Sequence, residues 1–93
     1  MKLVVGLGNP GKEYENTRHN IGYELANMFA KKYGCAFRTE RKFEADIFDI
    51  NINGEKVIVA KPLTYMNLSG NAVKKIVDFY NINSQDILIM HDD

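Results

Sequence analysis

The Asn53-Gly54 pair is the feature of this 93-residue sequence that most constrains its fold. Asn followed by Gly favours a type I′ turn, which joins two antiparallel strands through a two-residue loop. Such a loop pairs Ile50 with Val57 and Phe48 with Val59 on one face of a hairpin, while the opposite face is more polar. The sequence therefore predicts a β-hairpin in the middle of the chain.

Two short, continuous apolar runs predict strands that are covered on both faces. They are Lys2–Leu7 at the start of the chain and Ile87–Met90 near its end. The second hairpin strand stops at Lys61-Pro62, because proline donates no ladder hydrogen bond and disfavours helical geometry in the residue before it. Residues Asn81–Asp86 are interpreted as a polar loop before the last strand.

Two amphipathic helices are predicted between these strands. The first begins at Thr17 or Asn20 and ends at Gly34, in the position that glycine commonly takes after a last helical turn. The second begins near Asn67 or Ser69. Apolar residues at helical spacing are expected to be buried: Ile21, Leu25, Met28 and Phe29 in the first helix, and Val73, Ile76, Val77 and Tyr80 in the second. The predicted fold is α/β, a mixed sheet flanked by helices, in the order strand, helix, hairpin, helix, strand.

Composition restricts the class of protein. The chain is 45% hydrophobic and 26% charged with a formal net charge of zero, as in an ordinary single-domain globular protein. A single cysteine, Cys35, excludes an internal disulfide, and no apolar stretch reaches the length of a membrane span or a secretory signal core, so a cytoplasmic protein is expected. One group of basic residues is interpreted as a solvated face: Lys31, Lys32, Arg38, Arg41 and Lys42.

Gly6, Gly8 and Gly11 have the G-x-G-x-x-G spacing of a dinucleotide-binding loop, directly after the first predicted strand. In that fold the helix begins inside the loop, and a parallel crossover follows that ends in an acidic residue for the ribose. Here Pro10 and a polar run separate the glycines from the helical period, and a hairpin follows. A nucleotide-binding enzyme is therefore disfavoured, and the glycines are interpreted as allowing a sharp turn at the strand end.

Three polar segments are expected to meet at one edge of the sheet. A right-handed crossover makes the first and last strands parallel neighbours, and their carboxyl ends then lie where open α/β folds bind ligands. The second segment opens the second helix, so its amide donors point toward the same edge. The informative residues are Asn9, Tyr14, Thr17, Arg18, His19 and Asn20, then Tyr65, Met66, Asn67 and Ser69, and finally His91, Asp92 and Asp93.

The histidine and carboxylate side chains of these segments permit general-base chemistry. A histidine can take a proton from water while a neighbouring carboxylate stabilises the imidazolium, and asparagine side chains can orient a peptide or stabilise an oxyanion. No serine or cysteine has an obvious base beside it, which favours attack by activated water. His19, His91, Asp92 and Asp93 could ligate a metal but lack a familiar ligand spacing, so neither a metal nor a cofactor is expected.

Short motifs follow one another in order along the whole chain. They are Asn9-Pro10-Gly11 with Tyr14 and Thr17-Arg18-His19-Asn20, then Lys61-Pro62 with Met66-Asn67-Leu68-Ser69-Gly70, and last His91-Asp92. Together these motifs resemble the bacterial-type peptidyl-tRNA hydrolase family. The resemblance implies an enzyme that hydrolyses the ester between peptide and tRNA, and so recycles tRNA from stalled translation.

The resemblance also implies a role for each matching residue. The catalytic residues are His19, the general base that activates water, and Asp92, the carboxylate that supports it. His91 is interpreted as structural, because adjacent residues of a strand point to opposite faces. The remaining residues bind substrate: Asn9 and Asn67 near the ester, with Asn9 distinguishing peptidyl from aminoacyl groups, Tyr14 and Tyr65 at the tRNA end, and Met66 in the same pocket.

One departure from the family concerns length. Its members are longer, and they continue into a glycine-rich segment with another substrate-binding asparagine and a basic helical region that grips tRNA. Residues 1–93 are therefore expected to be a single-domain, N-terminal fragment that exposes an unpaired edge at Ile87–Met90 and self-associates, whereas full-length relatives are expected to be monomers. Whether the fragment is active stays open. A non-catalytic RNA-binding relative is the alternative, which retention of both His19 and Asp92 disfavours.

Overall fold

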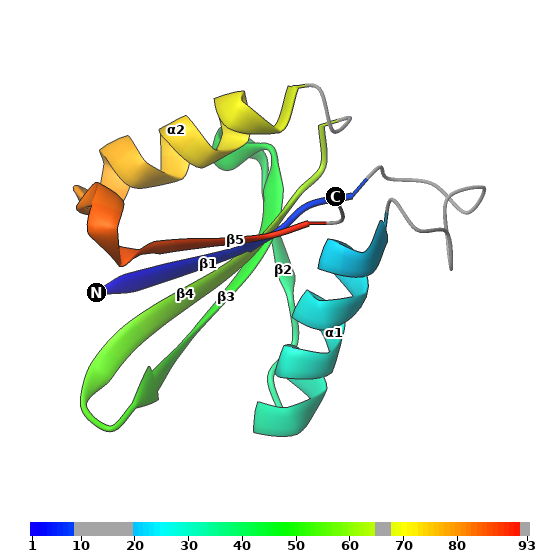
Figure 1. Ribbon diagram of the computed structural model, residues 1–93, viewed down its shortest axis with the longest axis vertical. Helices are drawn as coiled ribbons and strands as arrows, with labels where there is room; N and C mark the ends of the chain where they lie inside the picture. Colours follow the sequence, from blue (N-terminus) through cyan, green and yellow to red (C-terminus); the bar gives the residue numbers. More distant parts are fainter. Residues whose placement is uncertain (9–19, 65–67, 92–93) are drawn as a thin grey trace.

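A five-stranded mixed sheet lies between two helices in the computed structural model, which describes residues 1–8, 20–64 and 68–91 (Figure 1). No helix in these ranges is long and apolar enough to cross a bilayer. The predicted α/β fold and element order are confirmed. In chain order the elements are β1 (Lys2–Gly6), α1 (Ile21–Tyr33), β2 (Arg38–Glu40), the 3₁₀ turn η3 (Arg41–Phe43), β3 (Ala45–Ile52), β4 (Glu55–Pro62), α2 (Ser69–Tyr80), the 3₁₀ turn η5 (Ser84–Asp86) and β5 (Ile87–Met90).

The sheet has the strand order β2-β3-β4-β1-β5. β1 runs parallel to both β4 and β5, as the crossover argument predicts, and β3 runs antiparallel to β2 and β4. The hairpin register is also confirmed, with Ile50 opposite Val57 and Phe48 opposite Val59. Positive φ values of 52° at Asn53 and 83° at Gly54 give the turn the geometry that the Asn-Gly pair favours.

The two faces of the sheet bury separate apolar clusters, one under each helix. Successive side chains of a strand point to opposite faces, so Leu3 and Val5 face α2 whereas Val4 faces α1. Ile76 of α2 is fully buried against the first face. Phe48 packs under α1 with its ring centroid 4.8 Å from that of Phe37. Because both faces are covered, the continuous apolar character of β1 is explained.

The buried face of α1 differs from the predicted one. Ile21, Leu25 and Met28 are 39%, 41% and 65% exposed, so the prediction that they are buried is wrong. The buried residues of this helix are instead Gly22, Ala26 and Ala30. These small residues let the helix approach the sheet closely, which turns the larger side chains outward. The helix itself, its end at Gly34 and the buried face of α2 agree with the prediction, since Gly34 caps α1 in the left-handed conformation.

Polar residues form the edge strand β2, which the apolar pattern did not predict. Arg38 of β2 makes ion pairs with Glu40 at 3.3 Å and with Asp49 at 3.2 Å. These exposed pairs contribute little stability. The five residues of the predicted basic face are all exposed, which confirms that interpretation: Lys31, Lys32, Arg38, Arg41 and Lys42.

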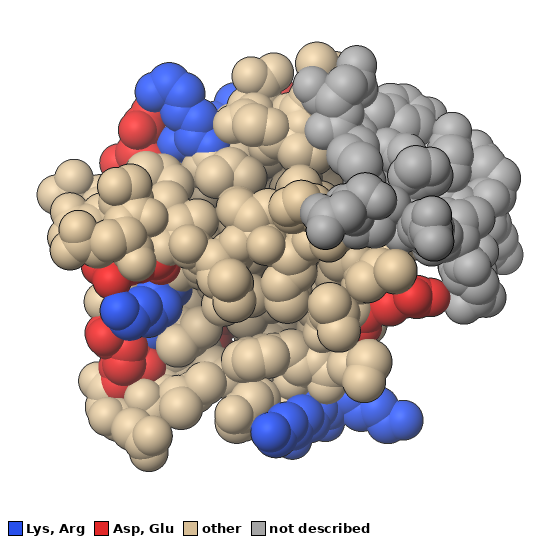
Figure 2. All heavy atoms as spheres, viewed as in Figure 1, with Lys and Arg blue, Asp and Glu red and all other residues tan. Residues whose placement is uncertain are grey.

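β5 forms an open edge of the sheet among the described residues, since it pairs there only with β1. Leu88 is 59% exposed and Ile89 is 38% exposed, so β5 is not buried on both faces in this chain. The predicted exposure of apolar surface at this strand is confirmed. Charged side chains lie mainly around the periphery of the face shown in Figure 2, and uncharged side chains cover its middle, where β5 crosses in Figure 1.

Candidate active site

The carboxyl ends of three parallel strands meet at one edge of the sheet. β1 ends at Gly6, β4 at Pro62 and β5 at Met90. Both helices begin at this same edge, α1 at Ile21 and α2 at Ser69 (Figure 1). Open α/β sheets bind their ligands at the carboxyl edge, so the described framework has the form expected for a site there.

All seven predicted site residues lie outside the described part of the chain: Asn9, Tyr14, His19, Tyr65, Met66, Asn67 and Asp92. Their nearest described neighbours in sequence are Gly8 and Asn20, Thr64 and Leu68, and His91. These neighbours follow the three strand ends or precede the two helices at the carboxyl edge. The framework thus brings the attachment points of the three predicted segments together, while the role of each side chain stays a prediction.

The first turn of α1 rests directly on the ends of β1 and β5. The Leu7 N–H donates a hydrogen bond of 2.9 Å to the Met90 carbonyl oxygen, and Gly22 lies over this bond. A Cβ at Gly22 would clash with the carbonyl oxygens of Leu7 and Met90, and one at Gly6 would clash with the carbonyl oxygen of Gly22. Only glycine at both positions allows this approach.

Gly8 serves the same close packing rather than a turn. A Cβ at Gly8 would lie 2.7 Å from the Tyr23 ring and 2.9 Å from Oδ1 of Asn20, which is itself only 5% exposed. Neither Gly6 nor Gly8 has a positive φ, so the interpretation that they allow a sharp backbone turn is wrong for these two glycines. Gly11 lies outside the described residues. Since α1 packs on Gly6 and Gly8, the described glycines have a structural role that needs no nucleotide.

Tyr23 joins the first turn of α1 to the end of β4. Its phenol hydroxyl group donates a hydrogen bond to the Pro62 carbonyl oxygen. Burial, assisted by the negative charge of Asp46, raises the pKa of Tyr23 to about 12, so the phenol keeps its donor proton at neutral pH. Beside it, Nζ of Lys61 lies 2.8 Å from Oδ1 of Asn27, and partial burial lowers the pKa of this lysine.

The described residues on either side of 65–67 carry buried hydroxyls. Thr64 Oγ1 and Ser69 Oγ have no hydrogen-bond partner within the part of the chain that the structure describes. Ser69 also lines a groove of about 400 Å³ between α2 and the strands β1 and β5, together with Leu7 and Ile89. Ser69 therefore does not cap α2 through its side chain, although the helix starts where the sequence predicts.

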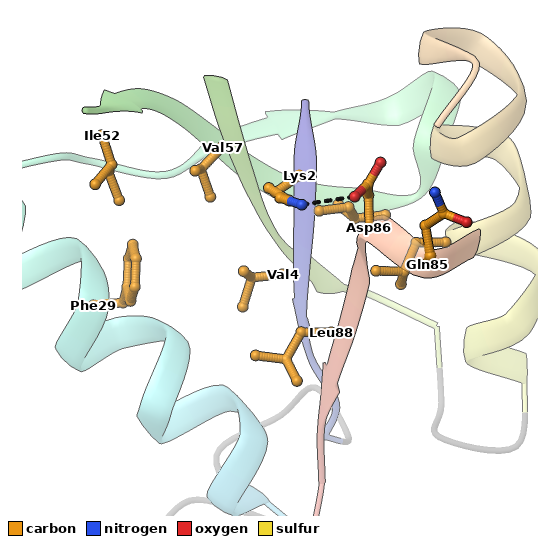
Figure 3. Close-up of a pocket in the computed structure, with 10 residues that line it drawn as sticks. Lys2, Val4, Phe29, Ile52, Val57, Gln85, Asp86 and Leu88 are labelled. Atoms are coloured by element: carbon orange, nitrogen blue, oxygen red, sulfur yellow. Dashed lines mark hydrogen bonds and ion pairs between the residues drawn. The ribbon is translucent and has the colours of Figure 1, made fainter. Parts of the chain in front are cut away.

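A second cavity, of about 430 Å³, lies between α1 and the sheet at the opposite end of the strands (Figure 3). Val4, Phe29 and Leu88 line it, and Lys2 and Asp86 form an ion pair of 2.7 Å at its rim. Lys2 begins β1 and Asp86 precedes β5, so this cavity is at the amino end of the parallel strands. Its position does not match the edge at which this kind of fold binds ligands.

No group of three or more His, Cys, Asp or Glu side chains within residues 1–8, 20–64 and 68–91 could hold a metal ion. Of the four possible ligands considered from the sequence, only His91 lies within these ranges, where it is exposed at the end of β5. His19, Asp92 and Asp93 lie outside them. The expectation of a site without metal therefore stays a prediction.

Sequence reasoning missed Gly22 and Tyr23, which shape the edge from α1. A signal for Gly22 was present, because glycine inside a predicted helix is unfavourable unless packing requires it. Tyr23 had no comparable signal, because the helical period alone does not reveal a bond to the Pro62 carbonyl.

The described residues form a three-layer α/β protein, and its candidate site lies at the carboxyl ends of the parallel strands β1, β4 and β5. Comparison with known proteins gives the family. The model of the peptidyl-tRNA hydrolase family matches residues 3–93, and the chain belongs to that family. This confirms the resemblance seen in the ordered motifs.

Individual relatives agree with this assignment. The chain is 53% identical to the peptidyl-tRNA hydrolase of Clostridium beijerinckii over all 93 residues, and 50% identical to that of Ligilactobacillus salivarius. It covers 48% and 50% of these two proteins, so it spans about half the length of the curated relatives that it matches. The crystal structure of peptidyl-tRNA hydrolase from Acinetobacter baumannii superposes with a TM-score of 0.95 at 44% identity, over all of this chain and 47% of that one.

Proposed function

We propose that the protein to which these residues belong hydrolyses the ester bond between peptide and tRNA in peptidyl-tRNA, and so returns tRNA to translation in the cytoplasm. The observation that carries the proposal is the family match over residues 3–93. The framework supports it, because the attachment points of the three predicted segments meet at the carboxyl edge of the parallel strands. Residues 1–93 form the N-terminal part of such a domain in this proposal.

The proposed chemistry begins with water. His19 removes a proton from a water molecule while the oxygen of that water forms a bond to the carbonyl carbon of the ester. The carbonyl oxygen becomes an oxyanion, which a neutral amide donor can stabilise without changing the charge of the site. Asp92 stabilises the imidazolium that His19 forms and holds its tautomer.

The tetrahedral intermediate then collapses. The bond between the carbonyl carbon and the tRNA oxygen breaks, and the imidazolium of His19 returns its proton to the leaving oxygen. The products are a peptide carboxylic acid, which then loses its proton to solvent, and tRNA with a free hydroxyl. The cycle consumes one water and needs neither metal nor cofactor.

The other five residues bind the two ends of the substrate in this proposal. Asn9 and Asn67 orient the peptide beside the ester, and Tyr14 and Tyr65 stack on or border the tRNA end, as aromatic side chains do with unpaired bases. Met66 shapes the wall of the same pocket. The experiment that tests the function is release of free tRNA from peptidyl-tRNA, measured beside the Acinetobacter baumannii enzyme at the same salt concentration. Tight tRNA binding without cleavage in both the chain and a longer protein that contains it would favour a non-catalytic RNA-binding role.

We expect Asn9→Ala to reduce the preference for peptidyl-tRNA over aminoacyl-tRNA. The amide of Asn9 is proposed to recognise the peptide group, so its loss removes a hydrogen bond that only the peptidyl substrate makes, and one such bond changes discrimination by about tenfold. The ratio of kcat/KM for the two esters measures this effect. Asn27→Ala, on the exposed side of α1, is the control and should leave the ratio unchanged. An unchanged ratio in Asn9→Ala would remove this residue from peptide recognition.

We also expect the 93-residue chain to self-associate through β5. Its open edge and the exposed Leu88 offer unpaired backbone groups and apolar surface to a second copy. Sedimentation velocity should therefore show a concentration-dependent increase in mass, which Leu88→Lys reduces. Phe79→Lys is a matched control on α2, because both side chains are 59% exposed. A monomer at all concentrations, or equal effects of the two substitutions, would contradict association through this strand.

A further inference from the structure

Gly22 occupies an unusual position over the last hydrogen bond between β1 and β5. The Leu7 N–H donates to the Met90 carbonyl oxygen at 2.9 Å, one residue beyond the paired Gly6 and Met90. A Cβ at Gly22 would lie 2.5 Å from the Leu7 nitrogen and would clash with the carbonyl oxygens of Leu7 and Met90. The backbone of α1 therefore touches both partners of this hydrogen bond.

A second contact, between Gly6 and the first turn of α1, holds this turn against the sheet. A Cβ at Gly6 would clash with the Gly22 carbonyl oxygen and lie 2.9 Å from the Cβ of Ala26, which is fully buried. We call Gly6, Leu7, Gly22 and Met90 the glycine seat. Within it, one turn of helix is placed by backbone contacts with two different strands, and backbone atoms cannot relax as a flexible side chain can.

Local conformation does not explain the glycine at position 22. Its φ is not positive, and glycine lowers the stability of a helix. Gly70 provides a comparison within the same chain, because it is the second residue of α2 as Gly22 is of α1, yet nothing would lie within 4 Å of its added Cβ. The two positions share backbone context and differ in contact, so the contact is what requires Gly22.

The sequence links the seat to both proposed catalytic residues. His19 precedes Gly22 by three residues, and Asp92 follows Met90 by two. We propose that Gly22 is a positioning residue for hydrolysis, whose seat holds the start of α1, three residues after His19, against the end of β5, two residues before Asp92. This inference rests on the proposed function, since it assumes that His19 and Asp92 act as a pair.

A direct test measures the pKa of His19 in the chain by NMR. The sequence has two histidines, so two imidazole signals need assignment. A nearby carboxylate stabilises the imidazolium, so Asp92→Asn should lower the His19 pKa. Gly22→Ala should lower the His19 pKa in the same direction, because the added methyl group moves the start of α1 away from β5. Gly70→Ala, the matched control, should leave this pKa unchanged.

Kinetics provide the second measurement, in the protein that hydrolyses peptidyl-tRNA. Displacing a catalytic group by about 1 Å can cost about 100-fold in rate, so kcat should fall about 10- to 100-fold in Gly22→Ala while KM changes little. The acid limb of the pH profile should move to lower pH, as the His19 pKa does. Gly70→Ala should leave kcat, KM and the pH profile unchanged. A purely structural role would lower the amount of folded protein without moving the acid limb.

Folding is checked on the same samples by circular dichroism and thermal unfolding. If Gly22→Ala does not fold, Ala26→Gly takes its place, because it removes the methyl group that packs on Gly6 without adding a clash. Ala30→Gly is its control, since it has the same cost in helix propensity one turn further from the seat. Ala26→Gly should lower the His19 pKa by less than Asp92→Asn does, and Ala30→Gly should not lower it.

The outcomes distinguish a failure of the positioning role of Gly22 from a failure of the proposed pairing between His19 and Asp92. A folded Gly22→Ala, or a folded Ala26→Gly in its place, with an unchanged His19 pKa would overturn the positioning role if Asp92→Asn still lowers that pKa. An unchanged His19 pKa in Asp92→Asn would overturn the pairing itself, and the proposed mechanism with it. Equal effects of Gly22→Ala and Gly70→Ala on kcat would also overturn the role of the seat.

Discussion

Replacing His19 by Ala is expected to lower the turnover of peptidyl-tRNA by about 10²- to 10⁴-fold, the range for loss of a general base. The proposed mechanism gives His19 both proton transfers, one from water and one to the leaving tRNA oxygen. KM should change little, because binding is assigned to other residues. Steady-state kinetics at saturating substrate measure the effect.

The control for this experiment is the second histidine of the chain. His91 lies at the carboxyl end of β5 and is exposed, and it is assigned no part in the reaction. His91→Ala should therefore keep turnover within a few-fold of the unsubstituted protein. Normal turnover in His19→Ala would refute water activation by this residue, and a metal or another base would have to be sought.

The hairpin and the parallel strands could be predicted from the sequence because local chemistry determines them. Asn53 and Gly54 tolerate the positive φ values of 52° and 83° that a two-residue turn requires, and the turn then fixes which residues face each other. The pairing of β1 with β5 follows from the handedness of the connection. Neither inference needed information about packing between helices and the sheet.

The buried face of α1 could not be predicted in the same way. A helical period identifies large apolar residues, and it favoured Ile21, Leu25 and Met28, which are exposed. Close approach of two backbones selects the smallest residues instead, and that approach depends on Gly6 in a different element. Contact between elements thus overrode the local pattern, and it also explains why the first two glycines of the loop were misinterpreted.

The edge of the sheet at β2 was missed for a different reason. Arg38–Glu40 has no apolar alternation, because both faces of this three-residue strand are at least partly exposed. Glu44, after η3, adopts a left-handed φ of 53° that its residue type does not favour, so no turn signal marked the start of β3. Residues 38–40 form a strand because they pair with β3, and no local sequence pattern indicates this pairing.

The sequence predicted where in the fold the candidate site lies, but it did not predict the contacts that shape the site. Strand ends and helix starts follow from patterns, and the structure places them together at the carboxyl edge. The motifs gave the family, which the comparison confirms over residues 3–93. The contacts of Gly22 and Tyr23 at this edge depend on tertiary approach and were not predicted.

Replacing Asp92 by Asn should affect the rate and the pH dependence together. In the proposed pairing the Asp92 carboxylate raises the pKa of His19 by stabilising the imidazolium, and the neutral amide does not. Since His19 acts as a base only when neutral, the rate falls as pH decreases through its pKa. Lowering that pKa moves the acid limb of the profile to lower pH, by about one unit or more for an adjacent charge. The plateau rate should also fall, by about tenfold or more, because the imidazolium formed in the transition state loses its partner.

Asp86→Asn is the matched control for Asp92→Asn, because Asp86 lies just before the amino end of β5 and pairs with Lys2 at 2.7 Å. This exposed ion pair contributes little to stability, so its loss should leave both kcat and the acid limb unchanged. If Asp92 acts only through His19, as proposed, the loss of rate in Asp92→Asn cannot exceed the loss in His19→Ala. The double variant His19→Ala, Asp92→Asn should accordingly be no slower than His19→Ala alone. If the two losses instead multiplied, Asp92 would act on the substrate or water independently of His19, and the proposed division between base and supporting carboxylate would be wrong.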